Sequence, residues 1–303
     1  EIVVSAKLFL DIVRRLPEEI VFIETDERMV TYIACGKVNY QIVGMSSVEY
    51  PDLPSFEQTD RITLNAKILR DMIRQTVYAV SENTAKPIYT GSLYEIEDGV
   101  FKIIAIDGYR MAIRSENVDS ESKNRFVVPG KTQHEVLKLL TDDEENTEII
   151  IGQRHITFKI KNYRIISRLI EGTFIEYKSA IPKETKTEVV INTRTIIDAV
   201  ERMSLLNNDR IQSPVRCIFS DDEIKLSCTS AVGRANDVIS VPIIGESVEI
   251  GFNNRYLLDA LKNADTDEIK LILNGSLTAM IVKPVKGDSY LSIVVPMRLA
   301  NES

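Results

Sequence analysis

Apolar positions along this chain follow two patterns, one typical of helices and one typical of strands. One stretch spaces its apolar residues by three and four: Ile68, Leu69, Met72, Ile73 and Val77. This spacing places them on one face of a helix. Residues 100–106 and 155–160 instead alternate, which is typical of half-buried strands. Asn65 and Asn192 each precede a helical stretch and are predicted N-caps.

The helical stretches recur along the chain at equal spacing. Three of them align without gaps, at residues 4–16, 128–140 and 252–264. Their first basic residues, Lys7, Lys131 and Arg255, are 124 positions apart in each step. A second helical stretch repeats as well, with Asn65 and Asn192 separated by 127 positions. A repeat of this length is the size of a domain rather than of a solenoid unit.

The repeat divides the chain into three copies of one domain. We assign residues 1–58, 59–183 and 184–303 to the three copies. The first holds one helix and strands only, so we expect it to lack its N-terminal half, with the sequence starting inside the domain. Each complete copy should pack two helices on one side of antiparallel sheets, an α+β arrangement.

Composition bounds the class of protein. The chain is 44% hydrophobic and 27% charged, which is ordinary for globular domains. The three cysteines have no metal-ligand spacing and are predicted to be reduced core thiols of a cytoplasmic protein. No apolar run has the length of a membrane span, and no signal peptide is visible. The net charge of −8 argues against a protein that holds DNA by charge alone.

Basic residues nevertheless share helix faces. Positions seven or eight apart lie on one side of a helix. Such pairs are Lys7 and Arg14, Lys67 and Arg74, Lys131 and Lys138, Arg194 and Arg202, and Arg255 and Lys262. They are either solvated helix faces or one shared surface for a polyanion, and charge alone does not decide between these interpretations.

Several motifs carry a resemblance to a known family. Residues 105–112 read AIDGYRMA after a predicted strand, and residues 296–299 read PMRL near the end of the chain. Residues 50–54 (YPDLP), 169–174 (LIEGTF) and 249–256 (EIGFNNRY) add to the pattern. In this order and spacing they resemble the bacterial DNA sliding clamp family, the beta subunit of DNA polymerase III, over all 303 residues.

The resemblance implies a DNA-clamp fold in which two chains form a head-to-tail ring of six domains. Helices would line the hole, sheets would form the wall, and double-stranded DNA would pass through without sequence readout. Weak, screened contacts with phosphates would let the ring slide. The expected DNA-facing residues are Lys7, Arg14, Lys67, Arg70, Arg74, Lys131, Lys138, Arg194, Arg202, Arg255 and Lys262.

The resemblance also implies a hydrophobic cleft between the second and third domains. It would bind short motifs of the polymerase III catalytic subunit, the clamp-loader complex and other clamp-binding proteins. The residues carried over are Gly108, Tyr109, Arg110, Met111, Ile175, Asn253, Tyr256, Leu277, Ala279, Ile293, Val295, Pro296, Met297 and Arg298. Ile175 stands where the family usually has proline, and Ser179 and Ala180 replace a larger pair. The resemblance therefore implies the cleft but not its exact peptide preference.

Homodimerisation is implied by the same resemblance. Tyr40 and Ile42 of one chain would meet Leu205 and Leu206 of its partner. Taken without the resemblance, these four would be read as core residues. Because the first domain is expected to be incomplete, ring closure by this chain stays open.

Two other functions are compatible with a globular protein of this composition. An enzyme finds little support: the chain has only two histidines, no phosphate-binding or nucleophile motif, and no acidic cluster with metal-ligand spacing. We therefore expect no catalytic residue, metal or cofactor. A peptide-binding scaffold that does not encircle DNA would keep the cleft while the basic helix faces would be incidental.

Overall fold

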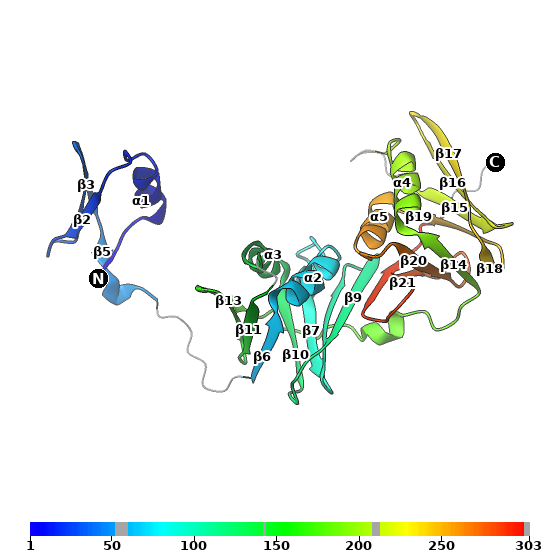
Figure 1. Cartoon of the computed structure of the whole chain (residues 1–303), viewed down its shortest axis with the longest axis horizontal. Coiled ribbons are helices and arrows are strands. Elements are labelled where there is room, and N and C mark those ends of the chain that lie inside the picture. Colours follow the sequence, from blue (N-terminus) through cyan, green and yellow to red (C-terminus); the bar gives the residue numbers. More distant parts are fainter. Residues whose placement is uncertain (52–59, 142–143, 208–212, 300–303) are drawn as a thin grey trace. The chain divides into compact units, whose positions relative to one another are not determined.

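The computed structural model describes residues 1–51, 60–141, 144–207 and 213–299. It contains two compact units, Glu1–Ser55 and Phe56–Ser303, which are described separately (Figure 1). The predicted boundary between residues 58 and 59 lies outside the described residues.

The first unit is a small layer of strands with one helix. Its elements are β1 (Ile2–Val3), α1 (Ala6–Val13), β2 (Val21–Thr25), β3 (Val30–Cys35), β4 (Val38–Val43), β5 (Met45–Ser46) and the 3-10 helix η1 (Ser47–Glu49). Strands β2, β3 and β4 form an antiparallel sheet, and β1 pairs with β5. Ile12 of α1 packs on Ile33 and Ile42 in its core.

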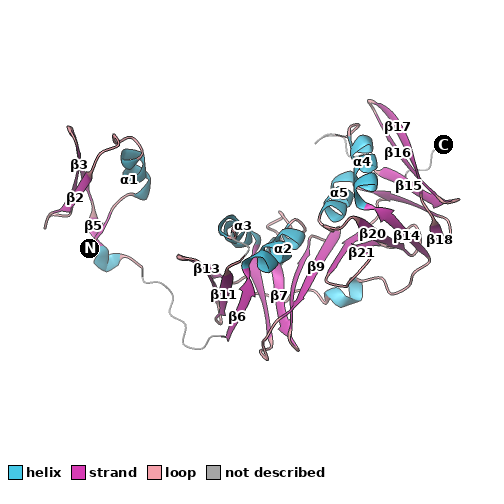
Figure 2. Cartoon of the chain, in the orientation of Figure 1, coloured by secondary structure: helices cyan, strands magenta, loops and turns pink. Residues whose placement is uncertain are grey.

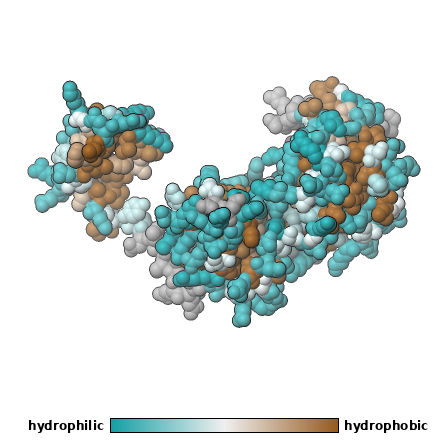
Figure 3. Space-filling view, viewed as in Figure 1, coloured by the Kyte–Doolittle hydropathy of each residue, from teal (hydrophilic) through white to brown (hydrophobic). Residues whose placement is uncertain are grey.

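This unit also carries exposed apolar surface, which is visible in Figure 3. Large apolar side chains exposed on it include Leu8, Leu10, Ile20, Phe22, Ile23, Val43, Met45 and Val48. Contiguous exposed apolar residues of this kind are typical of surfaces that another chain or domain covers.

The second unit contains two copies of a similar order of elements, and the second copy has one more strand between its two helices. The first copy comprises β6 (Asp60–Asn65), α2 (Ala66–Val77), η2 (Pro87–Thr90), β7 (Gly91–Glu97), β8 (Val100–Ile106), β9 (Arg110–Asn117), β10 (Asn124–Pro129), α3 (Gly130–Leu139), β11 (Asn146–Ile151), β12 (His155–Ile160) and β13 (Tyr163–Arg168). The connection η3 (Tyr177–Ala180) follows it. The second copy comprises β14 (Thr187–Asn192), α4 (Thr193–Ser204), β15 (Val215–Ser220), β16 (Glu223–Ser230), β17 (Gly233–Ser240), β18 (Ile243–Gly245), β19 (Val248–Phe252), α5 (Asn254–Lys262), β20 (Glu268–Leu273), β21 (Met280–Pro284) and β22 (Tyr290–Val294). We refer to these two copies as the middle and the last domain.

The helices form where the apolar spacing predicted them. In α2 the side chains of Leu69, Met72 and Ile73 are fully buried. The side chain of Asn65 accepts a hydrogen bond from Lys67 N (2.9 Å), and that of Asn192 accepts one from Thr195 N (3.0 Å). Both predicted N-caps are therefore confirmed, and each satisfies a backbone donor that has no partner inside its helix.

One sheet crosses from the middle domain into the last. Its nine strands run in the order β10-β7-β8-β9-β22-β21-β20-β14-β18. The two domains join where β9 pairs antiparallel with β22, with Met111 opposite Ile293. Helices α2 to α5 lie together on one side of the sheets, as Figure 2 shows. The α+β arrangement predicted from the repeat is confirmed.

Each domain has its own core, and a third cluster covers the junction. In the last domain Cys217 and Cys228 are buried within the core, and Cys35 is buried in the first unit. All three are free thiols, as predicted. The junction cluster joins Met111 and Ile293 to Phe174 of the segment that connects the domains.

Candidate functional site

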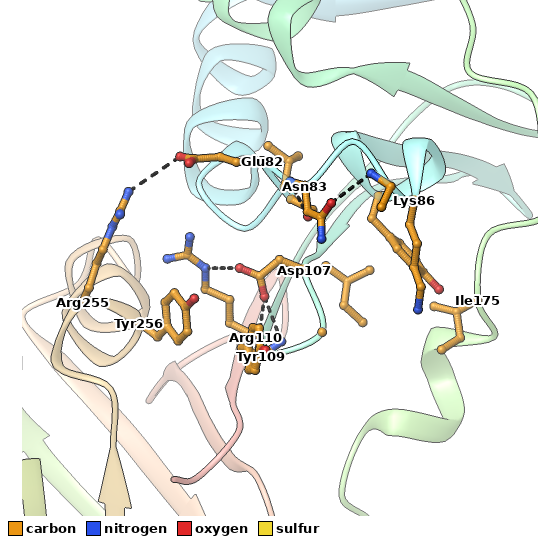
Figure 4. Close-up of a pocket in the computed structure, with 15 residues that line it drawn as sticks. Glu82, Asn83, Lys86, Asp107, Tyr109, Arg110, Ile175, Arg255 and Tyr256 are labelled. Atoms are coloured by element: carbon orange, nitrogen blue, oxygen red, sulfur yellow. Dashed lines mark hydrogen bonds and ion pairs between the residues drawn. The ribbon is translucent and has the colours of Figure 1, made fainter. Parts of the chain in front are cut away.

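A cavity of about 700 Å³ opens beside the junction of the middle and last domains (Figure 4). Its apolar and aromatic lining includes Tyr89, Ile106, Tyr109, Ile175 and Tyr256. The first four come from the middle domain and its connection, and Tyr256 comes from α5 of the last domain. Charged residues such as Glu82, Lys86 and Arg255 also line it, so the lining combines apolar and polar groups. A cavity of this size could take apolar side chains of a short peptide and also bond to its polar groups.

A tight turn carries the exposed part of the lining. Asp107 Oδ1 accepts hydrogen bonds from the backbone N–H groups of Tyr109 (2.9 Å) and Arg110 (3.0 Å). Gly108 has a φ of +92°, which a residue with a side chain adopts only with strain. The turn presents Tyr109 to the cavity with 60% of its surface exposed.

The next residue, Arg110, is 6% exposed and lies between the two domains. Its Nε donates to Asp107 Oδ2 at 2.9 Å, and its Nη1 donates to Asp259 of α5. The guanidinium carbon lies 4.6 Å from the centre of the Tyr256 ring and 5.4 Å from that of Tyr78. Two carboxylates and two aromatic faces thus compensate the cost of burying this charge.

Hydroxyl groups continue this arrangement into the junction. The Tyr78 hydroxyl lies 3.0 Å from the Tyr290 hydroxyl and 2.9 Å from Ser292 Oγ. Burial raises the pKa of Tyr78 to about 12, so it stays protonated. On the cavity side, the rings of Tyr109 and Tyr256 stack at 5.7 Å with 20° between their planes.

Five of the predicted cleft residues line the cavity: Gly108, Tyr109, Arg110, Ile175 and Tyr256. Three others lie beneath or beside it in the junction cluster: Met111, Ala279 and Ile293. Asn253 caps α5 by accepting from Arg255 N (3.0 Å) and Tyr256 N (3.3 Å), which positions Tyr256. The Val295 N–H donates to Tyr109 O at 2.8 Å and so supports the turn.

The remaining predicted cleft residues do not line this cavity. Met297 forms a bridge with Gly251, with its N–H donating to Gly251 O at 2.8 Å. Leu277 is 83% exposed in the turn between β20 and β21. Pro296 is half-buried and Arg298 is exposed near Met297.

Sequence reasoning missed one wall of the cavity and two aspartates. The wall is the loop after α2, which contributes Ser81, Glu82, Asn83, Ala85 and Lys86. Asp107 belongs to the AIDGYRMA motif but was not predicted as a residue of the site, and neither was Asp259, the partner of Arg110. The polar run between the end of a helix and Pro87 was the available signal for the loop, because such runs form exposed connections.

The predicted DNA-facing cations of the second unit lie on α2 to α5, most of them exposed, with Arg70 and Arg74 half-buried. Several are ion-paired with nearby carboxylates: Arg74 with Asp71 and Asp265, Lys138 with Glu135, Arg194 with Asp198, Arg202 with Asp237, and Lys262 with Glu201. Arg255 instead lines the cavity and pairs across the domains with Glu82 (3.9 Å). In the first unit, Lys7 and Arg14 are exposed on and just after α1.

The predicted dimer residues occupy different environments. Tyr40 on β4 is partly exposed, and Leu205 at the end of α4 is 83% exposed. Leu206 packs partly against the core of the last domain. Ile42 is buried in the core of the first unit, so its side chain also has a packing role there.

Two kinds of feature were not found in the described ranges. Among these residues, no group of three or more histidine, cysteine, aspartate and glutamate side chains is placed to hold a metal ion. None of the helices described has both the length and the apolar character that crossing a membrane requires.

Comparison with known proteins identifies the fold and its relatives. Family profiles of the DNA polymerase III beta subunit match residues 1–54 (N-terminal domain), 63–176 (central domain) and 178–298 (C-terminal domain). The chain is 33% identical to the beta sliding clamp of Halalkalibacterium halodurans, over 98% of this chain and 80% of that protein.

Solved structures agree with the sequence comparison. The DNA polymerase sliding clamp of Bacillus subtilis matches with a TM-score of 0.94 and 32% identity, over 99% of this chain and 80% of that one. The subunit beta of Pseudomonas aeruginosa DNA polymerase III matches with a TM-score of 0.91 and 26% identity, over 98% and 82%. The chain therefore belongs to the family of bacterial DNA polymerase III beta subunits, the beta sliding clamps.

Proposed function

We propose that this protein is a processivity factor of bacterial DNA replication, a non-catalytic homodimeric ring that encircles double-stranded DNA. The ring would hold the polymerase III catalytic subunit, the clamp loader and other partners through the cleft between the middle and last domains. Its place of action would be the cytoplasm. The observation that carries this proposal is the repeated domain whose helices share one side of the sheets while the cavity opens at the domain junction.

The charges on the helix side suit sliding rather than tight binding. Cations such as Arg194 and Lys262 already pair with carboxylates of the protein. These carboxylates partly neutralise the positive charge, so the attraction of the surface for DNA phosphates would be weak. Lys67 and Lys131 are exposed near the starts of α2 and α3. Sequence-independent, salt-sensitive contact with the DNA backbone is what such a surface supports.

Strand edges support the homodimer. Within the second unit, β22 pairs with β9. β22 is the final strand of the last domain, and β9 is the third strand after helix α2 of the middle domain. The equivalent strands left at sheet edges are β17 of the last domain, which corresponds to β9, and β4 of the first unit and β13 of the middle domain, which both correspond to β22. Pairing of β4 with β17 of a second copy would repeat the observed junction and bring Tyr40 near Leu205 and Leu206.

The decisive experiment compares retention on circular and linear DNA. The chain is loaded by a bacterial clamp loader onto nicked circular DNA, and co-elution with the DNA is measured in gel filtration as salt rises. We expect retention on the circle at high salt and release once the circle is linearised, because an encircling ring leaves only at an end. Equal release from both forms would favour the scaffold that does not encircle DNA.

Charge reversal tests the helix surface in the same assay. The variant Lys67→Glu/Lys131→Glu should lower loading roughly tenfold, since each lost phosphate contact weakens salt-dependent association. The control Lys123→Glu changes an exposed lysine between β9 and β10, away from the helices, and should load normally. Equal loading by all three proteins would contradict a role of these helix faces in contacting DNA.

A further inference from the structure

Two arginine–aspartate pairs cross from the middle to the last domain on the helix side. Arg74 of α2 pairs with Asp265 at 2.5 Å, and 40% of the arginine side chain is exposed. Arg110 pairs with Asp259 of α5, and 7% of its side chain is exposed. The first pair lies in solvent, where ion pairs contribute little. In the second pair the arginine is nearly buried and the aspartate is 31% exposed. The arginine belongs to the turn that lines the cavity.

Asp259 is linked to the cavity indirectly, by its hydrogen bond to Arg110. It holds one end of the Arg110 guanidinium while Asp107 holds the other. Asp107 also fixes the backbone of Tyr109 and Arg110, as described above. The guanidinium in turn lies over the ring of Tyr256, which stacks on Tyr109. Figure 4 shows Asp107, Arg110, Tyr109 and Tyr256 gathered in this way at one end of the cavity.

The internal repeat provides residues to compare with Asp259. The equivalent residues of the other two copies are Asp11 and Glu135. Each of these pairs with a residue close in sequence, Asp11 with Arg15 just after α1 and Glu135 with Lys138 in α3. In α5 the side chain of Asp259 instead bonds to Arg110 of the other domain. Local helix stabilisation therefore does not account for the carboxylate at this position.

We propose that Asp259 is a positioning residue for the peptide-binding cleft. Acting through Arg110, it fixes the turn at residues 107–110 and the Tyr109–Tyr256 stack, so the cleft is preorganised only while the two domains are docked. Preorganisation raises affinity because less ordering remains to be done on binding. This inference rests on the proposed peptide-binding function of the same cavity.

The test measures peptide affinity in three variants of the full chain. The probe is a short fluorescein-labelled peptide with leucine and phenylalanine anchors, followed by fluorescence polarisation. Asp259→Asn keeps the shape but removes the charge, and we expect about tenfold weaker binding. Asp259→Glu restores the carboxylate and should recover most of the affinity. Asp265→Asn, the matched control, breaks the exposed pair of the same junction and should bind like the unchanged chain.

A readout independent of the peptide separates positioning from simple stabilisation. The exchange of the Arg110 Nε–H with solvent, followed by 15N NMR, should become faster in Asp259→Asn and stay the same in Asp265→Asn. Equal loss of affinity in both asparagine variants, or unchanged Arg110 exchange in Asp259→Asn, would overturn the inference. Failure of the unchanged chain to bind the peptide would contradict the proposed cleft, and the exchange measurement would still decide the role of Asp259.

Discussion

Two fully buried tyrosines differ in the hydrogen bonding of their hydroxyl groups. Tyr290 bonds to Tyr78 at 3.0 Å and to Ala260 O at 3.5 Å. Among the described residues, none is a partner for the Tyr94 hydroxyl, and burial raises the pKa of Tyr94. A buried hydroxyl without a partner costs desolvation free energy that a phenylalanine would not.

We therefore expect opposite results from the same substitution at the two positions. Tyr94→Phe should raise the free energy of unfolding by about 1 kcal/mol, and Tyr290→Phe should lower it by about 1 kcal/mol. Urea denaturation followed by circular dichroism measures both. A loss of stability in Tyr94→Phe would show that its hydroxyl has a partner in solution.

At this scale the sequence predicted residue types better than their partners. It placed Tyr109 and Arg110 in the cleft, and both line the cavity. It assigned Arg255 to the DNA-facing set, but this side chain borders the cavity and pairs with Glu82. Partners that lie far apart in sequence, such as Asp259 and Arg110, depend on how the domains dock, and no local pattern encodes that.

The N-cap residue of α2, Asn65, caps the helix with its side chain, whereas Pro129, the N-cap residue of α3, makes no such hydrogen bond. Asn65 accepts from two backbone N–H groups at the start of α2. Asn65→Ala should lower the free energy of unfolding by about 1 kcal/mol, and Asn65→Asp, which keeps an acceptor, should lower it less. Thermal melts of the two variants measure the difference. Identical melting of Asn65→Ala and the unchanged chain would mean that the cap does not stabilise the helix.

Helices and strands were the features that the sequence predicted most completely. Spacing of apolar residues and the equal offsets of the repeat predicted the positions of the helices, and alternation predicted β8 and β12 at their observed bounds. The pairing of β9 with β22 was not derivable from these patterns. Alternation identifies a strand, but its neighbour in a sheet is set by tertiary packing.

For the whole molecule, the proposed pairing of β4 with β17 makes association testable. Leu205→Asp places a charge on a side chain that is 83% exposed next to this edge. We expect it to shift sedimentation equilibrium toward the monomer without lowering the melting temperature, because the residue contributes little to its own core. The control Leu277→Asp alters an equally exposed leucine away from β17 and should leave association unchanged. Equal association of all three chains would contradict an interface at β17.

The sheet that passes through the β9–β22 junction also has a mechanical consequence. Five residue pairs, from Tyr290 with Arg114 to Val294 with Arg110, connect the domains through the backbone. Rotation at this junction would break several main-chain hydrogen bonds at once, and also the ion pair of Arg110 with Asp259. The middle and last domains should therefore move as one rigid body. Any opening that admits a DNA strand would bend or separate the molecule at a junction other than this one.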